Sequence, residues 1–392
     1  MSYKKYKILL CSLLFLICSP LFSQQTIPWW LSLEYGKQKF RSKEYGDALL
    51  LFEDARRDRR AMYEQMERDL ISFLSLGEVR RIGDALDRVE QFSYERYYFS
   101  ASKALEELYY RIPKTSLKNS AAAALSSFDK LKNFPEAEYW IGEVYRVEGE
   151  LSLALAQYRR AYSMRDALED PDFSITLQYK IAYILGTRQE NNEMENVLLL
   201  IINNLDTLWT DSNKAETARL NDEDVKLPYA QASASFARTA MTKTLENSGV
   251  ERFLVMHRYN NGAVEQAHRL LGFYHVVRRQ TSAQPHLMFA FLIQNTIIIE
   301  EIRKRQFDFV FTTMPALMEE INKNPLLLTY INDVEYFKTV YYLGSSLFRN
   351  SHTAVARNIW IFLSAQPQAG EWQSRAVMQL RNPQVEPIIE RP

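Results

Sequence analysis

The residues best suited to acid–base or metal chemistry in this sequence are its five histidines. His268 and His275 are spaced so that both would lie on one face of a helix. Neither belongs to an HExxH motif. The pattern therefore favours structural or surface histidines, and we expect neither a metal site nor a cofactor.

Other chemistry-bearing motifs are missing or incomplete. The sequence has no P-loop, GxSxG or GxGxxG pattern. The acidic turn at 166–172 lacks the alternating oxygen ligands and central glycine of a calcium loop, so we expect it to cap a helix that begins near Phe173. We therefore predict no catalytic residue. A helical enzyme or a ligand-binding protein without a recognisable motif is the alternative, and a pocket with converging titratable groups would favour the enzyme.

Composition indicates a folded, helical chain. Hydrophobic residues make up 47% and charged residues 24% of the 392 positions, as in well-packed globular proteins. Glycine is scarce, at 12 residues, and hairpin dipeptides are almost absent. The apolar stretch 287–299 contains Gln294, Asn295 and Thr296 and is shorter than the ~20 residues that a membrane span needs. We expect a buried core helix there and no transmembrane span.

The first residues are typical of an export signal. Lys4, Lys5 and Lys7 form a basic start, and the apolar run 8–17 is too short to cross a bilayer core of ~30 Å. Cleavage is expected after the serine that ends the segment 1–23. The predicted compartment is the periplasm.

Export changes the chemistry available to the mature chain. Both cysteines, Cys11 and Cys18, lie in the signal peptide, so no thiol nucleophile, disulfide or cysteine-ligated metal is expected. A lipid anchor at Cys18 is the alternative to cleavage. Basic and acidic residues balance at 48 each without a basic cluster, which gives no electrostatic basis for binding nucleic acid.

Three windows repeat one order of small and aromatic residues, at the spacing of two helices joined by a tight turn. About six 34-residue periods separate Gly142 from Gly344, and about three separate Gly36 from Gly142. Weaker copies are expected at 182–201, 267–274 and 307–317. The three windows are YGKQKFRSKEYGDALLLFEDA (35–55), IGEVYRVEGELSLALAQYRRA (141–161) and YLGSSLFRNSHTAVARNIWIFLSAQP (342–367).

On these windows the chain resembles the tetratricopeptide-repeat (TPR) family, although Ser32, Glu138 and Val340 stand where that family has tryptophan. The resemblance implies an all-α fold: a right-handed superhelical solenoid of stacked antiparallel helix pairs, with several degenerate repeats. A non-repeating helical bundle is the alternative.

The expected organisation has three parts after the signal peptide. Residues 24–205 form N-terminal repeats, 206–228 an irregular acidic insertion, and 229–392 C-terminal repeats that end in a polar-faced closing helix near 372–380.

The resemblance also implies a docking groove lined by the first helix of each pair, and hence a function. We expect a non-enzymatic scaffold that binds other proteins within an envelope assembly, such as the outer-membrane, cell-wall or periplasmic flagellar-motor machinery. The sequence leaves the partner and the oligomeric state open. By register, the groove residues are Lys37, Phe40, Tyr139, Glu143, Arg146, Tyr341, Ser345 and Arg349.

Overall fold

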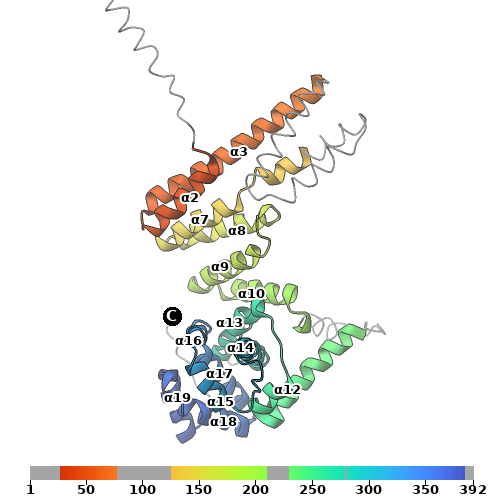
Figure 1. Cartoon of the computed structure of the whole chain (residues 1–392), viewed down its shortest axis with the longest axis vertical. Helices are drawn as coiled ribbons and strands as arrows, with labels where there is room; N and C mark the ends of the chain where they lie inside the picture. The colour runs from red at the N-terminus through yellow and green to blue at the C-terminus, as the bar shows by residue number, and fades with distance from the viewer. Residues whose placement is uncertain (1–26, 77–124, 210–228, 279, 385–392) are drawn as a thin grey trace, which may run out of the picture. The chain divides into compact units, whose positions relative to one another are not determined.

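The computed structural model describes residues 27–76, 125–209, 229–278 and 280–384. Within these ranges the regular elements are helices, with no strand, which confirms the all-helical prediction (Figure 1). The predicted signal peptide, with Cys18, lies outside the described residues.

The chain divides into two compact units, Met1–Leu177 (unit 1) and Gln178–Pro392 (unit 2). The boundary falls within helix α9 (Phe173–Thr187), earlier in the chain than the insertion expected at 206–228. Of that insertion, 210–228 lies outside the described residues.

Unit 1 is built from helices that pack on their neighbours in sequence. α2 packs on α3, α7 packs on α8, and α3 also packs on α7 (Figure 1). Left-handed backbone at Lys43 (φ 64°) and Gly149 (φ 85°) makes the two tight turns that reverse the chain. Besides the start of α9, the helices are α2 (Trp29–Arg41), α3 (Tyr45–Leu76), α7 (Pro135–Val147) and α8 (Leu151–Ser163).

A small residue on the first helix of a pair lets a ring from the second helix pack directly against the backbone. A Cβ atom at Gly36 would lie 2.5 Å from Phe52, and one at Gly142 would lie 2.7 Å from Tyr158. Both rings are fully buried. In unit 2, a Cβ at Gly344 would lie 3.0 Å from Trp360. These contacts follow the spacing that the three windows share.

A buried carboxylate joins three helices of unit 1. Glu138 of α7 is 1% exposed, and its oxygens lie 3.1 Å from an Arg56 nitrogen of α3 and 3.0 Å from an Arg160 nitrogen of α8. The two arginines remain partly exposed, so their charges still reach water. Glu138, which stands where the tetratricopeptide pattern would have tryptophan, thus makes ion pairs to both neighbouring helices.

Unit 2 surrounds one long apolar helix. α14 is buried over most of its length and packs against α13, α17 and α12, as the prediction of a core helix at 287–299 required (Figure 1). None of the helices described here is long and apolar enough to cross a membrane. The helices after α9 are α10 (Asn191–Leu205), α12 (Tyr229–Met256), α13 (Gly262–Val277), α14 (Ala283–Arg305), α15 (Met314–Asn322), α16 (Pro325–Asp333), α17 (Tyr336–Arg349), α18 (Thr353–Ser364) and α19 (Glu371–Arg381).

Two of the weaker windows need correction. At 307–317, Phe307 is 96% exposed and Val310 69% exposed, because α14 ends at Arg305 and a loop precedes α15. At 267–274, the close approach is made by Gly272, where a Cβ would lie 2.7 Å from Leu287. The predicted last helix is confirmed as α19, which packs on α18 and α17.

Candidate docking surface

Five partly exposed rings form a continuous row in unit 1, which we call the aromatic row. Its middle member, Trp140 of α7, lies with its ring centroid 5.4 Å from those of Phe40 on one side and Tyr139 on the other. Tyr45 extends the row beyond Phe40, at 5.4 Å, and Phe173 extends it beyond Tyr139, at 4.8 Å. Most contacts are edge to face, the arrangement that aromatic quadrupoles favour.

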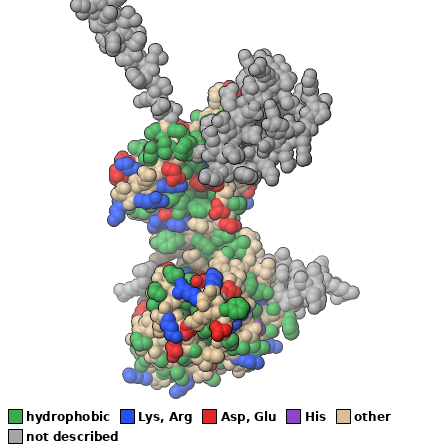
Figure 2. Space-filling model, viewed as in Figure 1, with side chains coloured by type: hydrophobic (Ala, Val, Ile, Leu, Met, Phe, Trp, Pro, Cys, Tyr) green, Lys and Arg blue, Asp and Glu red, His purple; other side chains and the backbone are tan. Residues whose placement is uncertain are grey.

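The aromatic row brings together residues from α2, α3, α7 and α9. None of the five rings is fully buried, and hydrophobic side chains are visible among charged ones on this unit (Figure 2). Large rings presented on rigid helices supply much contact area at little entropic cost, which is why aromatic residues dominate binding hot spots. The geometry suits the burial of a partner's apolar side chains.

A charged group lies beside Tyr139. The Glu143 carboxylate accepts a hydrogen bond from the Tyr158 hydroxyl at 2.7 Å and pairs with the Arg146 guanidinium, also at 2.7 Å. The hydrogen bond that Arg146 donates to Glu143 is the largest cause that raises the pKa of Arg146. Burial is the largest cause that raises the pKa values of Tyr139 and Tyr158. Arg146 therefore stays cationic, and both tyrosines stay neutral, at physiological pH.

The predicted groove residues of unit 1 fall into three situations. Phe40 and Tyr139 belong to the aromatic row, and Arg146 is partly exposed next to it. Glu143 is only 4% exposed and holds Tyr158 and Arg146 in place. Lys37 forms an ion pair of 2.7 Å with Glu34 on the same helix.

The predicted groove residues of unit 2 do not form a matching surface. Tyr341 is 0% exposed, because α19 covers it: its ring lies 5.4 Å from that of Trp372, and its hydroxyl accepts a hydrogen bond from Gln379. Tyr341 is therefore a core residue, and its assignment to a groove is corrected. Ser345 donates to the Tyr341 carbonyl oxygen at 3.2 Å, and Arg349 is partly exposed at the end of α17.

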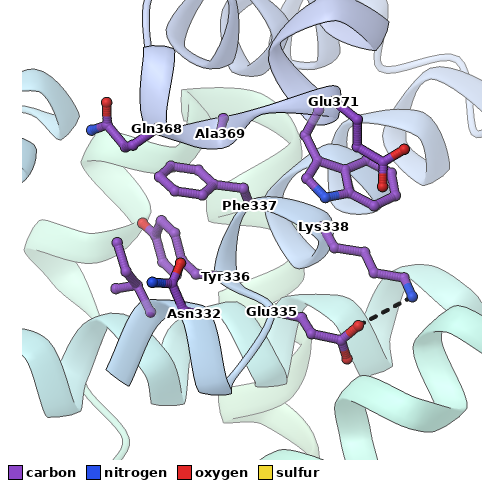
Figure 3. A pocket seen from close by; sticks show the side chains of 10 residues that line it. Asn332, Glu335, Tyr336, Phe337, Lys338, Gln368, Ala369 and Glu371 are labelled. Carbon is purple, nitrogen blue, oxygen red and sulfur yellow. Dashed lines mark hydrogen bonds and ion pairs between the residues drawn. The ribbon is translucent and has the colours of Figure 1, made fainter. Parts of the chain in front are cut away.

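A pocket of about 310 Å³ opens beside this covered region, between the α16–α17 turn and α19 (Figure 3). Phe337 and Trp372 supply its aromatic walls. Glu335 has a left-handed backbone (φ 46°) and pairs with Lys338, also in the wall, at 3.2 Å. Glu371 pairs with Arg375 at 3.3 Å. The charged groups of the wall are thus held in ion pairs within the protein, and the pocket offers a polar surface.

Unit 2 also contains a group that the sequence did not predict, the histidine cluster of His268, His275 and His286. His268 and His275 lie on α13 as their spacing indicated, and all three side chains are buried. His286, on α14, has its Nδ1 atom 3.0 Å from His268 Nδ1, while His268 Nε2 lies 2.9 Å from Asp206. Periodicity could place two of these residues on one face, but it carries no information about contacts between distant segments.

An Asp–His pair is the arrangement that activates nucleophiles in many hydrolases. Here the far side of His268 contacts a second imidazole, that of His286, and not a nucleophile. Phe289 stacks on the ring of His268, and Trp209 stacks on the ring of His286. Within the described residues, no group of three or more side chains could hold a metal ion. The cluster is thus a sealed part of the core.

Comparison with known proteins identifies relatives of similar length. No family model matches the chain. It is similar to an uncharacterized protein of Treponema pallidum (strain Nichols), with 24% identity over 357 residues, 90% of this chain and 89% of that protein. An uncharacterized protein of Borreliella burgdorferi is 20% identical over 285 residues, 68% of this chain and 78% of its own length. The first of these matches is longer than either unit, so the similarity extends across both.

Proposed function

We propose that this chain is a non-enzymatic, periplasmic scaffold that binds other proteins of the cell envelope through the aromatic row of unit 1. The observation that carries the proposal is the row itself, five partly exposed rings in mutual contact beside the cationic Arg146. Aromatic and arginine side chains contribute most of the free energy at typical protein interfaces. The assemblies it would serve include the outer-membrane, cell-wall and periplasmic flagellar-motor machineries.

The helix pairs support a tetratricopeptide-like solenoid as the framework of this scaffold. Gly36, Gly142 and Gly344 each meet a ring sixteen positions further on, as the register of that family requires. Ala182 and Leu198, both buried, repeat the same spacing. In such arrays the first helices of successive pairs line a continuous binding face, and both α2 and α7, which carry Phe40 and Tyr139, are first helices.

The test replaces Tyr139 and Arg146 together with alanine in the mature protein. Partner capture from envelope extracts, followed by quantitative mass spectrometry, should fall at least about tenfold for the proteins that the wild type retains, because two anchors worth ~1.4 kcal/mol or more in total are lost. The matched control is Tyr162→Ala with Arg165→Ala, a tyrosine–arginine pair of the same unit with the guanidinium 5.0 Å from the ring centroid and outside the aromatic row.

Circular dichroism of both double mutants checks that the fold survives. Capture of every partner at the wild-type level by a folded Tyr139/Arg146 variant would refute docking at the aromatic row. The equivalent change of Tyr341 and Arg349 is not a clean test, because removal of the buried Tyr341 ring would destabilise unit 2 itself.

A further inference from the structure

The histidine cluster lies where three segments of unit 2 converge. Asp206 directly follows α10, His268 belongs to α13, and His286 belongs to α14. Asp206 also accepts hydrogen bonds from the backbone N–H of Trp209, at 3.1 Å, and from the hydroxyl of Tyr259, at 2.8 Å. The cluster therefore anchors the end of α10 to the central helix pair.

The hydrogen bonds of His268 and His286 are consistent with one arrangement of protons in which both rings are neutral. An ionised carboxylate only accepts, so His268 Nε2 carries the proton that points at Asp206. In a neutral His268 the Nδ1 atom then accepts, and the His286 Nδ1–H donates to it across 3.0 Å. This arrangement is complete with both imidazoles neutral.

An added proton changes that arrangement wherever it binds, and it must be held in the core without hydration. On His268 it would set two N–H groups against each other at 3.0 Å, unless His286 changed its tautomer. On His286 it would create an imidazolium that burial deprives of hydration; the stacked Trp209 ring, at 4.3 Å, offsets only part of that loss, and burial remains the largest cause that lowers the pKa of His286. Arg238, with its guanidinium carbon 5.1 Å from the centre of the Trp209 ring, adds a further positive charge nearby.

Asp206 favours a charge on His268, but burial is the larger cause and lowers the pKa of that imidazole. The remaining neighbours act mainly on other groups of the cluster. Glu195 of α10 lies 3.8 Å from His275 Nε2, and Gln280 is hydrogen-bonded to His275 Nδ1, so these groups act on His275. Arg278 opposes a charge there. Tyr259 bonds to Asp206 and stays neutral, because burial raises its pKa.

We propose that the histidine cluster is an acid-sensitive lock, which holds Trp209 and the end of α10 against α13 and α14 at neutral pH and releases them when a proton enters. Release exposes the imidazoles to water, where each can be charged and hydrated. The inference does not depend on the proposed docking function.

The direction of the pH effect follows from proton linkage. Burial lowers the pKa values of His268, His275 and His286 below the ordinary value of 6.5. The open state therefore binds more protons than the locked state below about pH 6.5, and the locked state loses stability as the pH falls. Well above pH 6.5 both states are neutral at these residues, and protonation no longer opposes the locked state.

The experiment follows the tryptophan signal of the full mature chain between pH 7.5 and 5.0, by near-UV circular dichroism and fluorescence. The Trp209 contribution is the difference between the wild type and Trp209→Phe. We expect this contribution to change reversibly and cooperatively between about pH 6.5 and 5, before the far-UV helix signal is lost. A Trp209 contribution that stays constant over this range would overturn the proposal.

The decisive variant is His286→Asn, whose amide can still donate from the place of Nδ1 but cannot be protonated. Its transition should move at least about half a pH unit lower, because one proton-binding site is removed. The control is His352→Asn, a partly exposed histidine outside the cluster that pairs with Glu246; its transition should match the wild type. Equal midpoints for His286→Asn and the wild type would also overturn the proposal.

A measurement on the wild type covers the case in which His286→Asn does not fold. In nuclear magnetic resonance of histidine-labelled protein, the chemical shifts of the three cluster histidines should stay constant as the pH falls until the Trp209 indole signal changes. All three should then change together. Independent titration of these histidines near pH 6.5, with the Trp209 signal unaltered, would contradict the lock.

Discussion

At the scale of single residues, the contact between a glycine and a ring decides how closely two helices pack. Gly142→Ala would place a methyl group 2.7 Å from Tyr158, so we expect a loss of ~1–3 kcal/mol of unfolding free energy in spite of alanine's better helix propensity. Gly46→Ala is the matched control, since a Cβ there meets no atom within 4 Å and should leave stability unchanged or slightly raised. Thermal unfolding compares the stability of each variant with that of the wild type. A Gly142→Ala variant as stable as Gly46→Ala would show that the helices can move apart at no cost.

The sequence predicted these packing residues better than it predicted the surface. The rings Phe52, Tyr158 and Trp360 are buried where the register places them, because packing between the two helices of one pair is local in sequence. Tyr341 was misassigned because its exposure depends on α19, which has no counterpart in the repeat register. The bond between His268 and Asp206 was missed for the same kind of reason: it joins segments that lie far apart in the chain.

At the scale of elements, the ion pairs of Glu138 join α7 to α3 and α8. Glu138→Gln keeps the shape but removes the charge, and we expect it to cost ~1–2 kcal/mol, less than a fully buried pair because both arginines reach water. Glu138→Met should cost less than Glu138→Gln, since an apolar side chain of similar volume needs no hydrogen-bond partner at this buried position. Denaturant unfolding ranks the variants, and a Met variant less stable than the Gln variant would show that polarity matters there.

Helix pairing could be predicted from the sequence, but the lengths of the elements could not. The second helix of the first pair, α3, extends over 32 residues, well past the end of the repeat window at residue 55. No glycine or proline follows Gly46 within it, so nothing in its sequence ends the helix early. At 307–317 the sequence pattern predicted a helix where the structure begins with a loop. Arg303, Lys304 and Arg305 favour a helix C-terminus, and α14 ends at Arg305.

At the scale of the whole molecule, the predicted export would determine whether the protein keeps any thiol chemistry. If cleavage follows residue 23, the mature chain lacks both Cys11 and Cys18. Intact-mass analysis of the protein isolated from its native envelope should then give an N-terminus near Gln24, and a thiol reagent should label nothing under denaturing conditions. A lipid-modified Cys18 would identify the anchored alternative, whereas a chain that retains Met1 and two reactive thiols would contradict export.

The direct contact between glycine and ring also constrains how this chain can change over evolutionary time. A mutation that enlarges Gly36 or Gly142 is tolerable only after Phe52 or Tyr158 has become smaller, so the two positions should change in a fixed order, the ring first. At the equivalent spacing, Ala182 and Leu198 are both buried, and they have the combination that such a path would leave behind: alanine in place of glycine and leucine in place of the ring. Across relatives, the identities at these paired positions should therefore be correlated, even where the rest of the helix surface has diverged freely.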